Sequence, residues 1–501
     1  MGEVVPDGSR LTDRSTASID QCRTIWATAS SLDGRSSKHA RNWLEGRRLL
    51  VTASTVKPFT SRYCRPMQGT ATTRQTPDGW IHRHLAAIKI LIGVLAATMW
   101  GLFFDQLVRV GQWIFDTSPP VRLEPLSDLH YRFNDAHIAW VHGNLYAARV
   151  GSFSYPPFTA YIFLPFHLIG LQATDILWTV GSVFALAAVL SVALARWFPI
   201  SGTDAWLASS AGLAPAAVFA LYPFRSDLYW GQFGVFLLAL VFIDLFCVPK
   251  RFRGVLIGLA TAIKLLPGIF VFWLLFKRDL PSVARAVGTF LALTLLAAIF
   301  WPHASIEFWF HILPSGHQIQ MAADGPGKVI NRATWYLGVG RVANQSIRGL
   351  LAKPPFIWLG MWPWLPIAAI VLCGGIWIAW RLSEQQRDLA GFIVLALTGV
   401  LVSPVSWLHY WVFVGLAPFL AIIEWRRARP IAIASIVLAL STCANLESGS
   451  VPHFSPIGSP ALFVVRNLYV LGGLGFLVVA GFLAANGGSV EPVGDYKRVR
   501  T

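Results

Sequence analysis

The sequence predicts an all-α, polytopic transmembrane helix bundle. Of its 501 residues, 55% are hydrophobic and 13% are charged, whereas a soluble globular protein is typically about a quarter charged. The hydrophobic residues come in continuous blocks, near the roughly 20 residues that a helix needs to cross a bilayer, and not in the alternation of a membrane β-barrel. Helices satisfy their own backbone hydrogen bonds in lipid, so they are the expected elements.

About twelve hydrophobic blocks are expected to form helices, a few of them short. They lie at 85–104, 157–173, 176–195, 205–222, 233–249, 254–276, 284–301, 357–380, 389–403, 411–424, 430–443 and 461–484. Two long polar loops separate them, at 105–156 and 302–356. Lys264 and Pro267 interrupt one block, which predicts a broken or re-entrant pair of half-helices there.

The chain is expected to divide into five parts. These are a disordered polar tail at 1–80, a transmembrane module at 81–301 whose first loop carries the site, a second loop at 302–356, a C-terminal bundle at 357–484 and a polar tail at 485–501. The first tail lacks a hydrophobic run, so it is not expected to be a signal peptide. A start at Met67 is an open alternative.

The net charge of +16 is explained by membrane topology and implies no nucleic-acid partner. Basic residues cluster in the N-terminal tail and at the ends of hydrophobic blocks, as in 250–253 and 426–429. Loops rich in Lys and Arg stay in the cytoplasm. The chain is therefore expected in the cell inner (plasma) membrane, with both tails in the cytoplasm and both long loops on the outer side. Between 157 and 276 the number of spans, odd or even, stays ambiguous.

Polar side chains inside the hydrophobic blocks, or just outside the membrane, are candidate functional residues, because ionisable groups at membrane depth need a cavity or a partner. They are Asp128, Asp135, Arg225, Asp227, Gln232, Asp244, Lys264 and His409. Asp244 lies near the cytoplasmic end of its block, which favours a structural role. Lys264 either caps carbonyl groups of the broken helix or binds a lipid phosphate.

The second long loop contains three histidines and Glu307, but no pair has the tight helical spacing of a zinc site, so no metal is expected. Arg332 and Arg348 are better candidates for binding an anionic group, because a guanidinium presents paired donors to phosphate oxygens. The five cysteines show no metal-ligand spacing either.

An ordered set of short motifs runs from about residue 100 to about residue 410. It comprises Asp128, Leu129 and Tyr131; Gly143, Leu145 and Tyr146; Tyr155 to Phe158; Gly231 and Gln232; Lys264 and Pro267; Asn344, Gln345 and Ser346; and Ser403, Pro404, Ser406, Trp407 and His409. In this order the motifs resemble the GT-C type membrane mannosyltransferases of glycosyltransferase family 87. Two features depart from the family pattern. The distance from Asp128 to Gly143 is slightly long, with Asp135 between them, and Tyr410 stands where the family often has a further histidine.

The resemblance implies a GT-C architecture, a polyprenyl-phosphate donor carrying a hexose, most commonly mannose, and a catalytic aspartate on the outer face. Asp128 matches that aspartate, and Asp135 is a second candidate. In an inverting transfer this carboxylate accepts the proton of the acceptor hydroxyl, which belongs to a lipid or a glycan. No metal or other cofactor is required.

The remaining candidates are expected to bind the substrates. Cations and donors stabilise the charge that develops on the phosphate leaving group. The residues expected to supply them are His409, Arg348, Arg225 and Lys264. The residues expected to bond sugar or phosphate are Asn344, Gln345, Gln232 and Tyr131, with Trp407 as a stacking face.

A secondary transporter, or a flippase for lipid-linked sugars, is the alternative. About twelve helices, a broken helix and buried charges suit a transporter. Against this reading, the two halves of the chain show no internal repeat, and the polar groups are expected near one membrane surface. A non-catalytic scaffold would explain the helices but not the recurrent polar residues within them.

Overall fold

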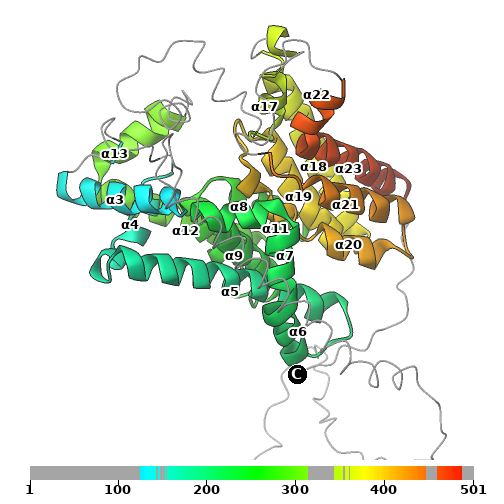
Figure 1. The fold of residues 1–501 in the computed structure, drawn as a ribbon, viewed down its shortest axis with the longest axis horizontal. Coiled ribbons are helices and arrows are strands. Elements are labelled where there is room, and N and C mark those ends of the chain that lie inside the picture. Colours follow the sequence, from blue (N-terminus) through cyan, green and yellow to red (C-terminus); the bar gives the residue numbers. More distant parts are fainter. Residues whose placement is uncertain are drawn as a thin grey trace, which may run out of the picture. The chain divides into compact units, whose positions relative to one another are not determined.

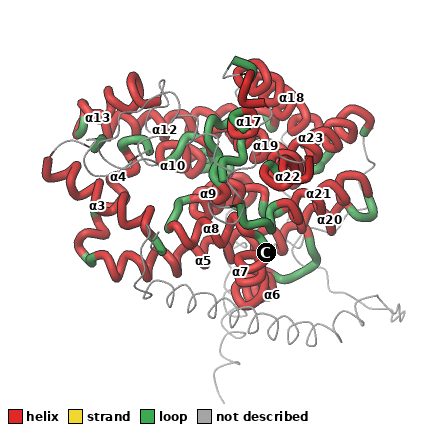
Figure 2. Tube along the Cα trace, turned by 45° about the horizontal axis from the view of Figure 1, so that its top comes forward, coloured by secondary structure: helices red, strands yellow, loops and turns green. Residues whose placement is uncertain are grey.

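The structure of the chain is a computed structural model that describes residues 125–142, 145–146, 153, 155–313, 343–353, 356–359, 362–446 and 460–487. Within these ranges every regular element is a helix (Figure 1), and Figure 2 shows helices joined by loops with no strand. The all-α prediction is thus confirmed for the described residues. Both predicted tails, the block at 85–104, Gly143 and Arg332 lie outside them, apart from the first residues of the C-terminal tail.

The first part of the described chain starts with a polar helix and contains two long apolar helices. Its elements are α3 (Ser127–His142), α4 (Phe158–Phe163), η1 (Pro165–Leu168), α5 (Leu171–Trp197), α6 (Gly202–Ala208), η2 (Ser209–Leu213), α7 (Ala214–Ala220), α8 (Tyr222–Trp230), α9 (Gly234–Phe246), α10 (Val255–Ile263), η3 (Leu266–Phe270), α11 (Val271–Phe276), α12 (Leu280–Phe300), α13 (Pro302–Ile306) and η4 (Glu307–Ile312).

The second part resumes after the second polar loop. Its elements are α17 (Ile347–Leu351), η5 (Phe356–Leu359), α18 (Trp364–Glu384), α19 (Asp388–Val402), η6 (Leu408–Val414), α20 (Ala417–Glu424), α21 (Arg429–Ser441), α22 (Pro460–Arg466) and α23 (Leu468–Asn486). Helices α18 and α21 each pack against α23, and α18 also packs against α19 (Figure 1).

Four helices of the described chain are long and apolar enough to cross a membrane: α5, α12, α18 and α23. A fifth span is possible if Gly202–Ala220 and Tyr222–Trp230, which are bent by 93°, are counted together. The prediction of about twelve spans is therefore not confirmed. Several predicted blocks form shorter helices, and three of them are divided where Pro165, Pro267 and Pro418 interrupt backbone hydrogen bonding.

The break in the block at 254–276 occurs where the sequence predicts it. Helix α10 ends at Ile263, Lys264 has extended backbone angles, and η3 starts at Leu266 with Pro267 in its first turn. Because Lys264 lies between the two helices and belongs to neither, its side chain can point away from them and reach residues of other segments.

Helix α19 lies at the centre of the described bundle. Every residue from 389 to 401 is buried, as expected for a helix that is apolar all round. The ring of Phe392 packs against Phe242 of α9 and Phe270 of η3, at centroid distances of 5.3 and 4.8 Å. Phe270 in turn stacks on Phe413 of η6 at 6.1 Å. Helix α19 also packs against α18, η6 and α23, so it is enclosed by elements from both parts of the described chain.

Helix α5 connects two chemically different ends of the described bundle. Near its start, the indole nitrogen of Trp178 donates to the Gln232 carbonyl at 3.3 Å. Near its end, Arg196 pairs with Asp388, the first residue of α19, at 3.6 Å. At about 1.5 Å per residue the segment between Trp178 and Arg196 is about 27 Å long, close to the roughly 30 Å of a bilayer core.

Charged side chains join several helices at the Arg196 end, here called the basic end. Lys277, just after α11, also pairs with Asp388 at 3.0 Å. Arg387 and Glu424 form a buried ion pair that connects the start of α19 to the end of α20. The opposite end of α5, near Gln232, is called the Gln232 end.

Asp244 has the structural role that the sequence favours. Its two carboxylate oxygens accept hydrogen bonds from the backbone nitrogens of Gly254 at 2.7 Å and Ile257 at 2.8 Å. The side chain thus satisfies two N–H groups at the start of α10, which have no partner within that helix.

We predict that Asp244→Ala lowers the stability of the protein by about 1–3 kcal/mol, because it leaves two buried N–H groups without acceptors. Thermal unfolding of the purified protein in detergent measures this effect. Glu384→Ala is the control, because Glu384 belongs to an exposed pair with Arg381, and such pairs contribute little. Equal melting temperatures for the two variants would contradict the prediction.

Candidate active site

The N-terminus of α3 lies against the turn between α8 and α9. The backbone nitrogen of Leu126 donates to the Tyr229 carbonyl at 2.7 Å. Gly231 has a φ of +65°, and a Cβ atom there would lie 2.6 Å from the Cβ of Leu129. Only glycine permits both the left-handed backbone and this close approach. Gly231 thereby brings the first turn of α3, with Asp128, beside Gln232.

Asp128 is held by two side-chain donors. Its Oδ2 atom accepts hydrogen bonds from the Gln232 side-chain amide and from Arg132, the latter at 3.2 Å. The Gln232 side-chain oxygen accepts from the Tyr155 hydroxyl at 2.7 Å. Gln232 and Tyr155 are buried, whereas the side chain of Asp128 remains 32% exposed. The carboxylate is therefore fixed in orientation but accessible.

Basic side chains from α3 and from two further segments gather beside this carboxylate. The Lys264 ammonium lies 5.2 Å from the ring centroid of Tyr155 and 3.4 Å from that of Tyr410. The Arg132 guanidinium lies 4.7 Å from the Tyr155 ring. The buried imidazole of His409 packs against Tyr410 at 4.9 Å. Cations over aromatic faces are stabilised by the ring quadrupole.

We call this group of side chains the Asp128 cluster. Its members are Asp128, Arg132, Tyr155, Gln232, Lys264, His409 and Tyr410. They come from α3, the loop before α4, the α8–α9 turn, the break after α10 and the start of η6. All of these segments lie at the Gln232 end.

Asp227 is a buried carboxylate next to the Asp128 cluster. It is 1% exposed, and its Oδ2 atom accepts from the Val235 backbone nitrogen at 3.1 Å. It also lies within electrostatic reach of Lys264. A Cβ at Gly234 would clash with the Asp227 carboxylate and approach the His409 carbonyl to 3.1 Å. Gly234 therefore allows η6, with His409, to pack closely on α9.

Asp135, the second predicted carboxylate, lies two helical turns after Asp128 on the same face of α3, because residues seven apart face the same side. It is 5% exposed, and its Oδ2 atom has no hydrogen-bond partner among the described residues. Burial raises the pKa of Asp135 to about 7, against the opposing effect of nearby Arg132.

Two predicted substrate-binding residues are placed outside the Asp128 cluster. Tyr131 is 53% exposed on α3, although its neighbour Arg132 faces the cluster. The Arg225 guanidinium stacks over Tyr222 of its own helix, 4.8 Å from the ring centroid. Neither side chain contacts a member of the cluster in the part of the chain that the structure describes.

Asn344 and Gln345 are wholly buried and bind the loop that carries His409. The Asn344 side-chain oxygen accepts from the Ser406 backbone nitrogen at 2.9 Å, and the Gln345 backbone nitrogen donates to the Ser406 carbonyl at 2.8 Å. The Gln345 side-chain amide donates to the Arg466 carbonyl at 2.8 Å. These contacts fix the course of the Ser403–Tyr410 loop.

Arg348 and Trp407 flank this loop. Arg348 is 7% exposed, with its guanidinium 5.2 Å from the Trp364 ring, and burial lowers its pKa to about 10. Trp407 is half-buried and immediately precedes η6. No group of three or more His, Cys, Asp or Glu side chains comes together within the described ranges as a metal site would require.

Three members of the cluster were not among the predicted site residues. Arg132 follows Asp128 by four positions, a spacing that places two side chains together on a helix and so could have signalled the pair. Tyr155 entered the sequence analysis only as the start of the motif Tyr155 to Phe158, and Tyr410 only as a departure from the family pattern. The contacts of Tyr155 with Gln232 and of Tyr410 with Lys264 join residues more than seventy positions apart in the chain.

The sequence comparison names the family of the chain. The model of glycosyltransferase family 87 matches residues 153–404, just over half of the chain. The chain therefore belongs to glycosyltransferase family 87.

Curated relatives come from mycobacteria. Two are named polyprenol-phosphate-mannose-dependent alpha-(1-2)-phosphatidylinositol mannoside mannosyltransferase. The one from Mycobacterium tuberculosis is 30% identical over 57% of this chain and 66% of its own length. The one from Mycolicibacterium smegmatis is 31% identical over 55% of this chain and 63% of its own. The match thus spans slightly less than two thirds of these relatives.

A third relative extends the match. The polyprenol-phosphate-mannose-dependent alpha-(1-2)-phosphatidylinositol pentamannoside mannosyltransferase of Mycobacterium tuberculosis is 27% identical over 69% of this chain and 80% of its own length. No solved structure matches the chain significantly.

The raised pKa of Asp135 predicts a pH-dependent stability. In the folded protein the carboxyl keeps its proton up to about pH 7, whereas in the unfolded chain it loses the proton near about pH 4. Between these values the folded state binds more protons, so its stability falls as the pH rises. Asp135→Asn removes this titration.

We therefore expect the melting temperature to fall more from about pH 5 to about pH 8 in the wild type than in Asp135→Asn. Thermal unfolding in detergent at both pH values measures the difference. Glu384→Gln, at an exposed site, should behave like the wild type. The same fall for Asp135→Asn and wild type would contradict the assigned shift.

Proposed function

We propose that the chain is a membrane glycosyltransferase that moves a hexose, namely mannose, from a polyprenyl-phosphate donor to a lipid or glycan acceptor, with inversion at the anomeric carbon. The observation that carries the proposal is the Asp128 cluster, which holds an accessible carboxylate beside three basic side chains. The family and the printed names of the mycobacterial relatives support the donor class.

Asp128 acts as the general base in this proposal. Gln232 and Arg132 bind one carboxylate oxygen, which leaves the other oxygen to meet the acceptor hydroxyl. The acceptor oxygen bonds to the sugar C1 carbon while its proton passes to Asp128. The bond between C1 and the phosphate oxygen breaks, and the polyprenyl phosphate leaves with the bonding electrons.

Arg132, Lys264 and His409 stabilise the leaving phosphate. The Nη1 atom of Arg132 is buried and has no hydrogen-bond partner among the described residues, and a phosphate oxygen would satisfy it. Fixed cations and donors lower the energy of the charge that develops on the phosphate. Gln232 and Trp407 are proposed to contact the sugar, and Asn344 and Gln345 to act through the loop that they hold.

Arg225, Tyr131 and Arg348 remain proposed substrate contacts outside the Asp128 cluster. Substrates that extend from the Asp128 cluster along α3 or toward α17 would pass the exposed Tyr131 or the Arg348 side chain. The acceptor is proposed to be a mannosylated phospholipid, by analogy with the phosphatidylinositol mannoside in the relatives' names.

The Asp128 cluster is proposed to face the outer side of the inner (plasma) membrane. Basic residues mark the opposite end of α5, and the cytoplasmic side is the basic side. Leu291, Leu295 and Ile299 form an exposed apolar face on α12, where lipid can cover the protein. A donor with a polyprenyl chain can therefore reach the cluster sideways through the bilayer.

The location of the polar groups also separates this proposal from a transporter. Alternating access uses a site near the middle of the membrane, between related halves of the protein. Asp128, Gln232 and His409 gather instead at one end of the helices, about 27 Å from the basic end by the length of α5. This arrangement favours a reaction at one membrane surface.

We expect Asp128→Asn to lower mannosyl transfer by about 10²–10⁴-fold, the usual effect of losing a general base. Transfer from a short-chain polyprenyl-phosphate-mannose to a lipid acceptor pool measures it. Asp175→Asn is the matched control, since Asp175 pairs with His130 of α3 outside the cluster and its loss should change the rate little.

Asp135→Asn completes this experiment. Loss of transfer in Asp135→Asn together with normal transfer in Asp128→Asn would assign the base to Asp135. Retention of full activity by both folded variants would contradict a carboxylate base on α3.

We also expect Lys264→Gln to lower kcat/KM for the donor by about 10- to 100-fold, because a charged hydrogen bond to the phosphate is lost. Arg225→Gln tests the other predicted cation, which stacks on Tyr222, and should have the smaller effect. A larger loss for Arg225→Gln than for Lys264→Gln would place the phosphate on α8 and not in the Asp128 cluster.

A further inference from the structure

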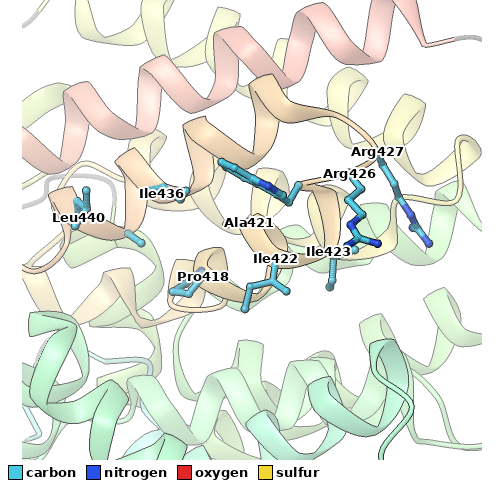
Figure 3. A pocket seen from close by; sticks show the side chains of 10 residues that line it. Pro418, Ala421, Ile422, Ile423, Arg426, Arg427, Ile436 and Leu440 are labelled. Atoms are coloured by element: carbon cyan, nitrogen blue, oxygen red, sulfur yellow. The ribbon is translucent and has the colours of Figure 1, made fainter. Parts of the chain in front are cut away.

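A groove of about 730 Å³ lies between α20 and α21. Its walls are apolar, and Ile422 and Leu440 are each 64% exposed. Arg426 and Arg427 also line it. Figure 3 shows these two arginines together at one end, with Ile436 and Leu440 toward the other. The groove is thus apolar along its length and cationic at one mouth.

The two arginines are available to a ligand. Both are exposed, and within the described ranges neither forms an ion pair. The carboxylate closest to them in sequence, Glu424, is 2% exposed and forms a buried ion pair with Arg387. The positive charge at the groove mouth is therefore not neutralised by that neighbour.

The groove mouth lies at the opposite end of its helix from the Asp128 cluster. His409 is at the start of η6, which continues with α20 as one apolar segment, Leu408–Glu424. With about 2.0 Å per residue in a 3-10 helix and about 1.5 Å in an α-helix, this segment is about 26 Å long. Arg426 follows it directly, at the basic end where Glu424 meets Arg387.

We propose that this groove binds an anionic glycerophospholipid of the cytoplasmic leaflet. The lipid phosphate binds the guanidinium groups of Arg426 and Arg427, which present paired donors to phosphate oxygens. One acyl chain lies along Ile422, Ile436 and Leu440 toward the middle of the membrane. Trp425, 48% exposed beside the arginines, takes the place that tryptophan favours at the membrane interface.

Charge and position select this occupant. Basic residues next to a membrane helix attract the anionic lipids of the cytoplasmic leaflet, and an apolar groove adds the burial of a hydrocarbon chain. The donor phosphate cannot bind both here and beside Asp128, because the two sites lie about 26 Å apart along the η6–α20 segment. The groove is therefore a second lipid site, independent of the proposed reaction.

Native mass spectrometry of the full chain in detergent tests this site. Phosphatidylglycerol and phosphatidylcholine with the same acyl chains are titrated separately, and the bound lipid is counted. We expect tighter retention of phosphatidylglycerol by the wild type, and about tenfold weaker retention by the double variant Arg426→Gln, Arg427→Gln. The matched control is Lys250→Gln with Arg251→Gln, an exposed basic pair outside the groove.

Ala439→Trp is the second variant, because it fills the apolar part of the groove and keeps both arginines. It should also weaken phosphatidylglycerol retention. Equal retention of the two lipids by the wild type, or equal losses in the arginine and control pairs, would overturn the proposal. A third result would also overturn it: groove variants that lose a protein dimer present in the wild type but retain as much lipid as the wild type. Size-exclusion profiles identify variants that fail to fold, and no readout depends on transferase activity.

Discussion

The close packing of α3 on the turn after α8 is the contact on which the rest of the site depends. Gly231 leaves room for Leu129, and this contact puts Asp128 within reach of Gln232. Gln232 in turn accepts a hydrogen bond from Tyr155, and the ring of Tyr155 packs against the cationic groups of Arg132 and Lys264. A larger residue in place of Gly231 would prevent this close approach. It would separate the Asp128 carboxylate from its donors and from the basic side chains without changing any of those residues.

The bundle positions this chemistry by burying its central helices. Helix α19 is buried on all sides, and the loop that follows it is fixed by Asn344 and Gln345 before it delivers His409 to the cluster. The same helices carry salt bridges at their other ends. One end of the fold thus carries the proposed site for a phosphate and a sugar, whereas the other carries the basic residues that are proposed to face the cytoplasm.

The sequence predicts those features that depend on local composition. The apolar blocks within the described residues become helices, Lys264 and Pro267 break one of them, and Asp244 has a structural role. The number of spans is not predictable in this way, because prolines divide apolar blocks without changing their hydropathy. The contacts of Tyr155 with Gln232 and of Tyr410 with Lys264 come from tertiary packing of distant segments, and the sequence alone gives no measure of that packing.

The most direct test is an experimental structure of the protein with a non-transferable polyprenyl-phosphate-sugar analogue, determined by cryo-electron microscopy. The account predicts density for the phosphate within hydrogen-bonding distance of Lys264, Arg132 or His409, with the sugar C1 carbon facing Asp128. Phosphate density bound instead at Arg225 or at Arg426 and Arg427, with the sugar away from α3, would contradict the assignment of the Asp128 cluster as the active site.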